Sequence, residues 1–329
     1  MSEHISVALC TYNGVRFIKE QLDSILRQTI LPDQIIISDD GSTDGTIECI
    51  EQFWAETIQG NHFFNSIELT LLRNENSLGV TKNFEQALKA CTHSLIALCD
   101  QDDVWVATKL EQLSEMFDEN KKLLLVFTDS RLVDAEGHPL GLTSFEALSV
   151  SSWEKAAFES QQGTQVFLKR NLATGATMML RRQLLDVATP FPTEWVHDEW
   201  LALIASFAGD VRLYDECLID YRQHGSNQIG MKKPGIKHYI GRLIFPRTER
   251  NLRLYLRAQQ MSEHSFFQQA NTEAFLAAQG KLEHETARRQ LPASRINRIK
   301  PIVREMRTGR YKKFGLGSQD IARDLIQPA

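Results

Sequence analysis

The chain has 329 residues, of which 42% are hydrophobic, and a formal net charge of -5 at pH 7. This composition excludes a largely disordered protein, and no apolar run approaches the roughly 20 residues that cross a bilayer. Because the N-terminus runs into a strand pattern without a signal-peptide core, we expect a cytoplasmic protein.

Short β-rich runs alternate with helix-like patterns through the first half of the chain. The expected strands cover residues 5–10, 34–38, 67–72, 94–99 and 123–128, and the expected helices cover residues 15–27, 43–54, 80–91 and 105–120. This alternation predicts an α/β fold with a Rossmann-like, mostly parallel central sheet flanked by helices. Ligands of such sheets bind at the carboxyl ends of the strands.

The pattern is less regular from about residue 140 to 230. We expect a helix at 153–160, a loop and strand at 174–180, a helix at 199–208 and a strand at 217–220. The chain beyond residue 230 has a helical pattern, with 252–279 as the longest candidate and with Pro292 and Pro301 as helix breaks. The sequence therefore predicts an α/β domain over residues 1–230 and a basic, mainly helical region over residues 231–329.

Charge separates these two regions. Residues 1–230 contain 17 Lys and Arg against 34 Asp and Glu, whereas residues 231–329 contain 20 against 8. Basic and apolar residues alternate in 236–245 and 296–304, which leaves two interpretations open: docking on an anionic membrane surface, or packing against acidic protein. The sequence has no recognisable nucleic-acid-binding module, so nucleic acid is not an expected partner.

The tetrapeptide Asp100-Gln101-Asp102-Asp103 directly follows the apolar run 94–99. Three carboxylates at the end of a buried strand repel one another unless a cation or a polar ligand lies between them. Carboxylate oxygens are the ligands that Mg2+ and Mn2+ prefer, so this turn is a candidate divalent-metal site, with a solvated acidic turn as the alternative.

Polar loops also follow the first two expected strands. The first contains Thr11, Tyr12 and Asn13, and the second runs from residue 39 to 46. Residues 42–44 are suited to cap a helix that begins near Thr43. In the same loop, Asp40 is a candidate acceptor for the ring N–H of uracil or thymine, and Asp39 is a candidate support for the turn.

Two side chains in the second half are candidates for the same site. Asp198 precedes the apolar run of the helix expected at 199–208, so it is either a helix cap or a general base. His224 lies on a loop after the strand expected at 217–220, where it is either structural or a third ligand of Mn2+.

Three segments, 6–14, 37–46 and 100–105, together resemble glycosyltransferase family 2, and the resemblance covers about residues 4–230. It implies a GT-A fold, a UDP- or dTDP-linked sugar donor, Mn2+ or Mg2+ as cofactor and inversion at the anomeric carbon. It also implies a role for each matching residue: nucleotide binding by Thr11, Tyr12, Asn13, Asp40 and Asp100, metal binding by Asp102, Asp100 and His224, and proton abstraction by Asp198.

One departure concerns the base motif, which is often Glu-Asp in this family and is His197-Asp198 here. The segments 174–179, 196–200 and 221–224 look like the subgroup that contains rhamnosyltransferases of bacterial surface polysaccharides, including the O-antigen of lipopolysaccharide. This likeness implies a saccharide acceptor, lipid-linked in one version, and an enzyme at the cytoplasmic face of the inner membrane. It also suggests donor or acceptor contacts by four residues: Gly175, Ala176, His197 and Trp105.

Two alternatives remain open. One is a catalytically silent nucleotide-sugar-binding subunit of a polysaccharide assembly complex. The other is a sugar-phosphate nucleotidyltransferase, which is disfavoured because such enzymes need a glycine-rich loop after the first strand, where this chain has only Gly14. A dehydrogenase is disfavoured because no GxGxxG motif follows that strand.

Overall fold

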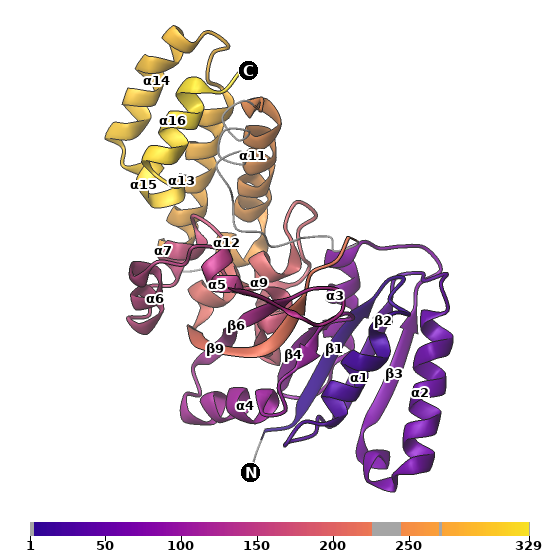
Figure 1. Cartoon of the computed structure of the whole chain (residues 1–329). Coiled ribbons are helices and arrows are strands. Elements are labelled where there is room, and N and C mark those ends of the chain that lie inside the picture. Colours follow the sequence, from indigo (N-terminus) through magenta and orange to yellow (C-terminus); the bar gives the residue numbers. More distant parts are fainter. Residues whose placement is uncertain (1–2, 226–244, 270–271, 329) are drawn as a thin grey trace. The chain divides into compact units, whose positions relative to one another are not determined.

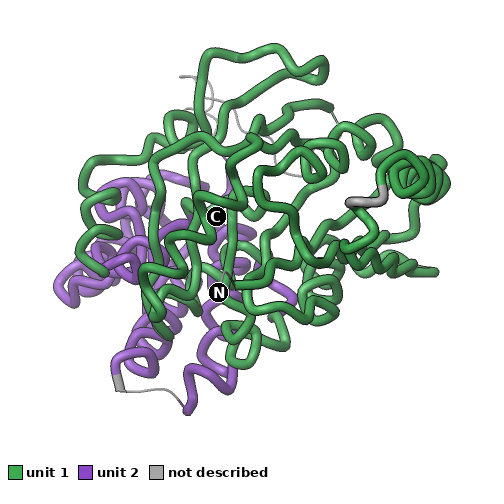
Figure 2. The backbone as a smooth tube through the Cα atoms, turned by 90° about the horizontal axis from the view of Figure 1, so that it is seen from below, with its two compact units in different colours: residues 1–161, 172–191, 196–232 green, residues 162–171, 192–195, 233–329 purple. Residues whose placement is uncertain are grey.

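We describe the protein from a computed structural model, which covers residues 3–225, 245–269 and 272–328. The chain divides into two compact units, shown in Figure 2. Unit 1 contains residues 1–161, 172–191 and 196–232, and unit 2 contains residues 162–171, 192–195 and 233–329. Two short segments of the region expected to form the first domain therefore belong to unit 2.

Unit 1 is built on one nine-stranded sheet with the order β3-β2-β1-β4-β8-β6-β9-β5, and β7 pairs with β6. The strands are β1 (Ile5–Thr11), β2 (Gln34–Asp39), β3 (Glu68–Arg73), β4 (Leu95–Asp100), β5 (Val104–Trp105), β6 (Leu123–Val133), β7 (Pro139–Thr143), β8 (Met179–Arg181) and β9 (Asp210–Arg222). Strands β3, β2, β1 and β4 are parallel, as predicted. The rest of the sheet is mixed, because β8 lies antiparallel between β4 and β6.

Helices cover both faces of the sheet in unit 1. They are α1 (Ile18–Leu26), α2 (Thr46–Gly60), α3 (Val80–Ala90), α4 (Lys109–Glu119), α5 (Ser144–Ala147), α6 (Ser152–Glu159), α8 (Leu185–Ala188) and α9 (His197–Ala208), with the 3-10 turns η1 (His62–Ser66), η2 (Gly175–Thr177) and η3 (Arg182–Leu184). The chain steps from β1 to β3 in one direction and back to β4 in the other. Because such crossovers are right-handed, α1 and α2 lie on one face and α3 on the opposite face (Figure 1). Every side chain of β1 and β2 is consequently buried.

Element boundaries show where local patterns were insufficient. Four of the five strands expected in the first half agree with the structure to within one residue at each end, whereas β6 continues five residues further, to Val133. Strand β9 begins at Asp210 rather than at residue 217, because its exposed middle, with Asp215 and Glu216, lacks the apolar pattern of a strand. The helix expected to begin near Thr43 begins at Thr46, so residues 42–44 belong to the preceding loop.

Unit 2 is helical in the part of it that the structure describes. Its helices are α7 (Thr164–Phe167), α11 (Arg247–Glu263), α12 (Ser265–Gln269), α13 (Thr272–Arg289), α14 (Arg295–Arg307), α15 (Arg310–Phe314) and α16 (Ser318–Ile326). The single helix expected over 252–279 is therefore divided among α11, α12 and α13. Most of the basic stretch 236–245 lies outside the described residues, which resume at residue 245.

Proline positions in unit 2 give one confirmation and one correction. Pro292 lies between α13 and α14, as expected for a helix break, but Pro301 lies inside α14. A proline there removes one backbone hydrogen bond, so packing must hold the helix together. That packing comes from buried Arg298 and Ile302, and Arg298 donates hydrogen bonds to the carbonyl oxygens of Pro292 (2.7 Å) and Gln327 (2.6 Å). Within the described ranges, none of the helices is both long and apolar enough to cross a membrane.

Candidate active site

The loop after β1 and the turn after β4 are joined by one side-chain amide. Gln101 accepts a hydrogen bond from the Tyr12 backbone N–H (2.8 Å) and donates one to the Tyr12 carbonyl oxygen (3.0 Å). A Cβ atom on Gly14 would lie 2.1 Å from Oε1 of Gln101, so the close approach of this amide requires glycine at position 14. Neighbouring parallel strands thus present two of the predicted polar loops as one connected edge.

The loop after β2 is attached to the same edge. The hydroxyl of Thr11 donates to Oδ2 of Asp39 (2.7 Å), and Asp39 also accepts the backbone N–H of Ser42 (2.8 Å), so Asp39 supports the turn as expected. Asn13 accepts a hydrogen bond from the Thr43 backbone N–H (2.9 Å). Thr11 is buried, whereas Tyr12 is 49% exposed, so Tyr12 is the best placed of the predicted nucleotide contacts in this loop.

The carboxylate of Asp40 lies at the carboxyl end of β2 and is enclosed by the segment that leads into α3. It accepts four hydrogen bonds, from Nδ2 of Asn74 (3.2 Å), Oγ of Ser77 (2.6 Å) and the backbone N–H groups of Leu78 (2.7 Å) and Gly79 (3.0 Å). A carboxylate has about four acceptor positions. A nucleobase N–H would therefore share or replace one of these donors.

Asp102 and His224 lie side by side, although 122 residues separate them in the sequence. Nε2 of His224 is 2.7 Å from Oδ2 of Asp102, and the His224 ring stacks on Phe17 with 4.8 Å between ring centroids. Strand β9 places His224, and the turn after β4 places Asp102. The structure thus brings together two of the three side chains that the sequence predicts as metal ligands.

Arg222 holds the acidic turn against the end of β9. Its backbone N–H donates to Oδ1 of Asp103 (3.0 Å), its Nε donates to the Asp102 carbonyl oxygen (2.8 Å), and its guanidinium pairs with Glu20 (2.5 Å). Sequence reasoning missed this residue. A cation directly before a candidate ligand loop was the available signal, but the acidic turn that it contacts lies about 120 positions earlier in the chain.

Negative charge is poorly compensated in this turn. Burial, with the charges of Asp102 and Asp198, raises the pKa of Asp100 to about 7, while nearby Lys109 opposes the rise. Burial and the charges of Asp102 and Asp100 raise the pKa of Asp103, whose Oδ2 has no hydrogen-bond partner among the described residues. Carboxylates that resist ionisation in one cluster favour a bound cation.

Lys109 is a second residue that sequence reasoning missed. Its buried ammonium donates to the carbonyl oxygen of Ala176 (2.7 Å) and lies 3.9 Å from the centroid of the Trp105 ring. Burial lowers the pKa of Lys109 to about 8. Lys109 therefore places a cation behind the acidic turn and fixes Ala176, while Trp105 is buried beside it. The predicted substrate contacts of Ala176 and Trp105 stay predictions.

Asp198 lies in the first turn of α9, whose N-cap residue is Val196, so Asp198 is not itself the cap. Its Oδ2 accepts the Gly175 backbone N–H (3.2 Å), and its Oδ1 accepts the Glu199 backbone N–H (2.5 Å). Because Asp198 raises the pKa of Asp100, the two carboxylates interact electrostatically. The predicted base thus lies within electrostatic range of the predicted acidic turn, and a shared role of the two in one active site stays a prediction.

His197 lies in the interior next to Asp198. Its ring stacks on Phe84 with 3.9 Å between centroids, and neither ring nitrogen has a hydrogen-bond partner among the described residues. A Cβ atom on Gly175 would lie 2.7 Å from Nε2 of His197, so glycine at 175 makes room for the ring. Burial lowers the pKa of His197 to about 3, which keeps the ring neutral. The His197 ring is thus packed against Phe84 and close to Gly175, and a substrate contact by His197 stays a prediction.

The donor set fits a divalent cation that shares its coordination with a substrate. Among the described residues, no three His, Cys, Asp or Glu side chains are placed to hold one metal ion. Mg2+ and Mn2+ are commonly bound by one or two protein ligands, with phosphate oxygens and water completing the shell. The adjacent Asp102 and His224 suit that mode, and Asp100 as a further ligand stays a prediction.

Comparisons with known proteins identify the family and the fold of the chain. A model of the family described as "Glycosyl transferase family 2" matches residues 6–187, more than half of the chain. An uncharacterized protein of Mycobacterium tuberculosis is 26% identical over 67% of this chain and 59% of its own length, so the chain spans about three fifths of that relative. The Escherichia coli UDP-Glc:alpha-D-GlcNAc-diphosphoundecaprenol beta-1,3-glucosyltransferase WfgD is 27% identical over 61% of this chain and 69% of its own length. The Shigella flexneri dTDP-rhamnosyl transferase RfbG is 36% identical over 31% of this chain and 34% of its own length.

Two solved structures share the fold. TarS 1-349 of S. aureus, crystallised with UDP, aligns with a TM-score of 0.53 and 17% identity over 94% of this chain and 89% of its own. The mannosyltransferase PcManGT of Pyrobaculum calidifontis, in complex with GDP-Man and Mn2+, aligns with a TM-score of 0.53 and 17% identity over 99% of this chain and 86% of its own. The predicted GT-A-like fold is therefore confirmed.

Proposed function

The chain belongs to glycosyl transferase family 2, and from this membership we propose that it transfers a sugar from a nucleoside-diphosphate sugar to a hydroxyl group. The acceptor is a growing surface polysaccharide or a lipid-linked oligosaccharide, and transfer inverts the anomeric carbon. The observation that supports the proposal is the contact between Asp102 and His224 after β4, together with the effect of Asp102 and Asp198 on the ionisation of Asp100.

Donor binding is assigned to the edge formed by the three polar loops. Tyr12 is exposed at this edge and would stack on the nucleobase, while Asp40 would accept the base N–H in exchange for one of its present donors. Uracil and thymine present the same N–H, so both UDP- and dTDP-sugars suit Asp40. The similarity to RfbG makes dTDP-rhamnose the first donor to test.

Departure of the nucleoside diphosphate leaves negative charge that the site must balance. Asp102 and His224 would hold a divalent cation, with Asp100 assisting. A bound Mn2+ or Mg2+ would supply the positive charge that stabilises the leaving diphosphate. Lys109 would not contact the donor. Its hydrogen bond to the Ala176 carbonyl oxygen would hold the η2 segment close to the acidic turn.

Asp198 is the proposed base. One of its carboxylate oxygens takes the proton of the acceptor hydroxyl as that oxygen attacks the anomeric carbon from the face opposite the diphosphate. The N–H groups of Gly175 and Glu199 orient the carboxylate, and the N-terminus of α9 favours its negative charge. General-base assistance of this kind contributes about 10²–10⁴-fold to rate.

Location at a membrane forms part of the same proposal. The name of WfgD describes transfer to a diphosphoundecaprenol-linked sugar, which is a lipid-linked acceptor. We infer by analogy that this enzyme works at the cytoplasmic face of the inner membrane. The basic region after residue 230 would then contribute to contact with anionic lipid.

A donor panel tests the proposed reaction. Release of nucleoside diphosphate from UDP-, dTDP- and GDP-sugars is measured with Mn2+ and with EDTA, for the wild type, Asp198→Asn and Asp102→Ala. Lys122→Gln, which changes an exposed residue, is the control. We expect metal-dependent release by the wild type and the control.

The two active-site variants should differ from each other. Asp198→Asn should keep donor binding, measured by titration calorimetry, and lose about 10²–10⁴-fold in turnover. Asp102→Ala should lose the Mn2+-dependent part of donor affinity.

Two results would contradict the proposal. Donor binding without turnover by the wild type, with any sugar acceptor offered, would favour a silent binding subunit. Unchanged turnover of Asp198→Asn would remove Asp198 from the mechanism, even if the chain is a transferase.

A further inference from the structure

Helix α14 in unit 2 has one face that holds the unit together. Arg298, Ile302 and Glu305 are buried on that face, and Glu305 pairs with His284 (2.8 Å). Arg298 is fully buried, and its guanidinium donates hydrogen bonds to the carbonyl oxygens of Pro292, before α14, and Gln327, after α16. The orientation of α14 within unit 2 is therefore fixed by its inner face.

The outer side of α14 is apolar as well as basic. Ile296 is 78% exposed, Ile299 is 52% exposed and Val303 is 39% exposed. Their spacing of three and four residues places them in one row along the helix. Such a row of exposed branched side chains is costly in water unless another surface covers it.

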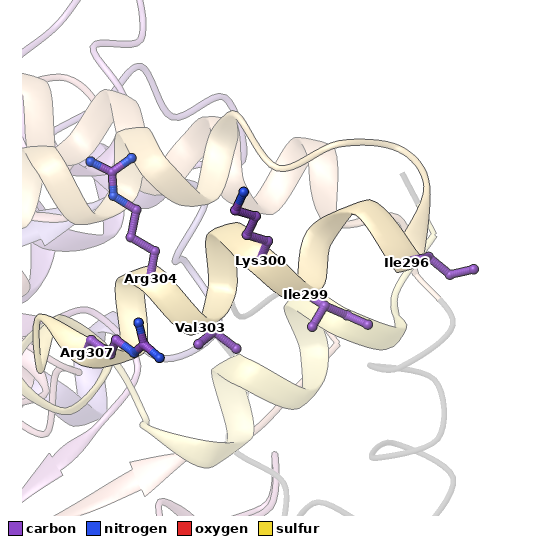
Figure 3. Close-up of a pocket in the computed structure, with 6 residues that line it drawn as sticks. All are labelled: Ile296, Ile299, Lys300, Val303, Arg304 and Arg307. Atoms are coloured by element: carbon purple, nitrogen blue, oxygen red, sulfur yellow. The ribbon is translucent and has the colours of Figure 1, made fainter.

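A row of cations runs beside this apolar row. Lys300, Arg304 and Arg307 are exposed and, among the described residues, form no ion pair. Together with the three apolar residues they line a hollow of about 510 Å³. Figure 3 shows Lys300 and Arg304 leaving one side of α14, and Ile299 and Val303 leaving another. We call these six residues the α14 docking face: Ile296, Ile299, Lys300, Val303, Arg304 and Arg307.

The chemistry of the α14 docking face restricts what can cover it. A second copy paired symmetrically through this face would bring three cations against the same three cations. A polyanion without an apolar interior would leave Ile296 and Ile299 in water. An anionic bilayer surface offers phosphates at the level of the cations and acyl chains just beneath them, which is the arrangement that interfacial amphipathic helices use.

We propose that the α14 docking face binds the surface of an anionic lipid membrane. Ile296, Ile299 and Val303 enter the interface between headgroups and acyl chains, while Lys300, Arg304 and Arg307 contact lipid phosphates. This proposal concerns unit 2 alone and does not depend on the reaction proposed for unit 1.

Co-sedimentation of the full chain with vesicles tests the proposal. The vesicles contain either phosphatidylcholine alone or phosphatidylcholine with phosphatidylglycerol. We expect the wild type to bind only the second kind and to be released by added salt. The charge variant Lys300→Gln/Arg304→Gln/Arg307→Gln should lose about a hundredfold in partitioning, because each cation near an anionic surface contributes about fivefold. The apolar variant Ile296→Ser/Ile299→Ser/Val303→Ser should also bind more weakly.

Matched controls separate this face from general charge and general hydrophobicity. Lys122→Gln/Arg253→Gln/Lys312→Gln removes the same charge from exposed positions elsewhere, and Leu140→Ser/Val187→Ser/Leu252→Ser removes exposed apolar side chains elsewhere. We expect both controls to bind like the wild type. All substituted residues are exposed, so thermal unfolding should show that every variant remains folded.

Three outcomes would overturn the proposal. The first is equal binding of the wild type to neutral and anionic vesicles. The second is a loss of binding in the controls as large as in the α14 variants. The third is a dimer in sedimentation velocity without lipid that the apolar variant dissociates, since the face would then serve self-association. Because the readout is vesicle binding, none of these outcomes bears on whether the chain transfers sugars.

Discussion

Both units bury carboxylates, but they surround them differently. In unit 2 the fully buried Asp324 pairs with Arg288 (2.8 Å) and Arg250 (2.7 Å) and accepts the hydroxyl of Tyr311 (2.9 Å). Burial opposes ionisation of nearby Asp320, yet Arg288, the Leu316 N–H group, Arg250 and Arg323 together lower the pKa of Asp320. In unit 1, by contrast, burial and acidic neighbours raise the pKa of Asp100.

The difference separates structural charge from functional charge. A buried carboxylate with matched cations contributes to packing, and its environment is complete without a ligand. Carboxylates that disfavour one another's ionisation are typical of sites that bind a further group. Identical Asp→Asn changes in the two units should therefore have opposite effects on stability.

Asp324→Asn should show the largest effect on stability. We expect the free energy of unfolding to fall by about 3–5 kcal/mol, because the buried Arg288 and Arg250 lose their charged partner. Chemical denaturation of the full chain measures the change. Asp118→Asn, which removes one exposed partner of Lys121, is the control and should change it by less than about 1 kcal/mol. Equal effects in the two variants would remove the contrast between buried and exposed pairs.

Lys109→Met tests whether the acidic turn depends on its buried cation. The variant leaves the Ala176 carbonyl oxygen without its donor and removes positive charge from behind Asp100 and Asp103. We expect a loss of about 1.5–3 kcal/mol in unfolding free energy and weaker donor binding. Lys122→Met, at an exposed position, should change neither. Wild-type stability in Lys109→Met would mean that the turn does not need this cation.

His197→Phe tests the effect of a buried histidine ring whose nitrogens have no hydrogen-bond partner among the described residues. The folded-state pKa of His197 is about 3 and its ordinary value is 6.5, so the unfolded chain takes up the proton first as pH falls. Stability is therefore lost as pH drops from about 6.5 towards 3, and the loss from this ring reaches about 2 kcal/mol at pH 5. His197→Phe should lack that component in unfolding measured at several pH values. His138→Phe changes an exposed ring and should retain the wild-type slope.

Asp100→Asn should show the smallest effect, with the opposite sign. At pH 8 and without added metal, we expect the free energy of unfolding to rise by about 1 kcal/mol, because the amide removes a charge that burial disfavours and that Asp102 and Asp198 repel. The same measurement on Asp324→Asn gives the matched comparison. A loss of stability in Asp100→Asn as large as in Asp324→Asn would show that the two carboxylates are held in the same way.

The sequence predicted the parts of the site that follow directly from strand ends. Asp100, Asp102 and Asp40 follow apolar strands, and parallel strands bring their carboxyl ends to one edge. His224 was predicted from its residue type and position, and the structure places it against Asp102. The loop placements need only parallel neighbouring strands, which the alternation of strands and helices predicts, whereas the contact between His224 and Asp102 also needs the pairing of β9 within the sheet.

The remaining contacts depend on distant pairings that no local pattern encodes. Lys109 reaches Ala176 across 67 positions, and Arg222 reaches Asp102 across 120. Trp105 and His197 lie next to motif residues in the sequence, but one is packed against Lys109 and the other against Phe84. The sequence could not show that these two side chains are buried, and their contacts with substrate stay predictions. The low helix propensity of proline predicts a helix end at Pro301, but propensity takes no account of tertiary packing such as the buried Arg298 three residues earlier.

The amide of Gln101 occupies the space that a side chain at position 14 would need. The residues tolerated at these two positions therefore depend on each other. A methyl group at position 14 would collide with the tip of the residue 101 side chain rather than with backbone, so a shorter partner can relieve the collision. Homologous chains with alanine or serine at position 14 should thus carry a truncated residue at position 101. Replacing Gly14 therefore calls for a shorter residue at position 101, whereas Gln101 can be shortened while Gly14 is kept.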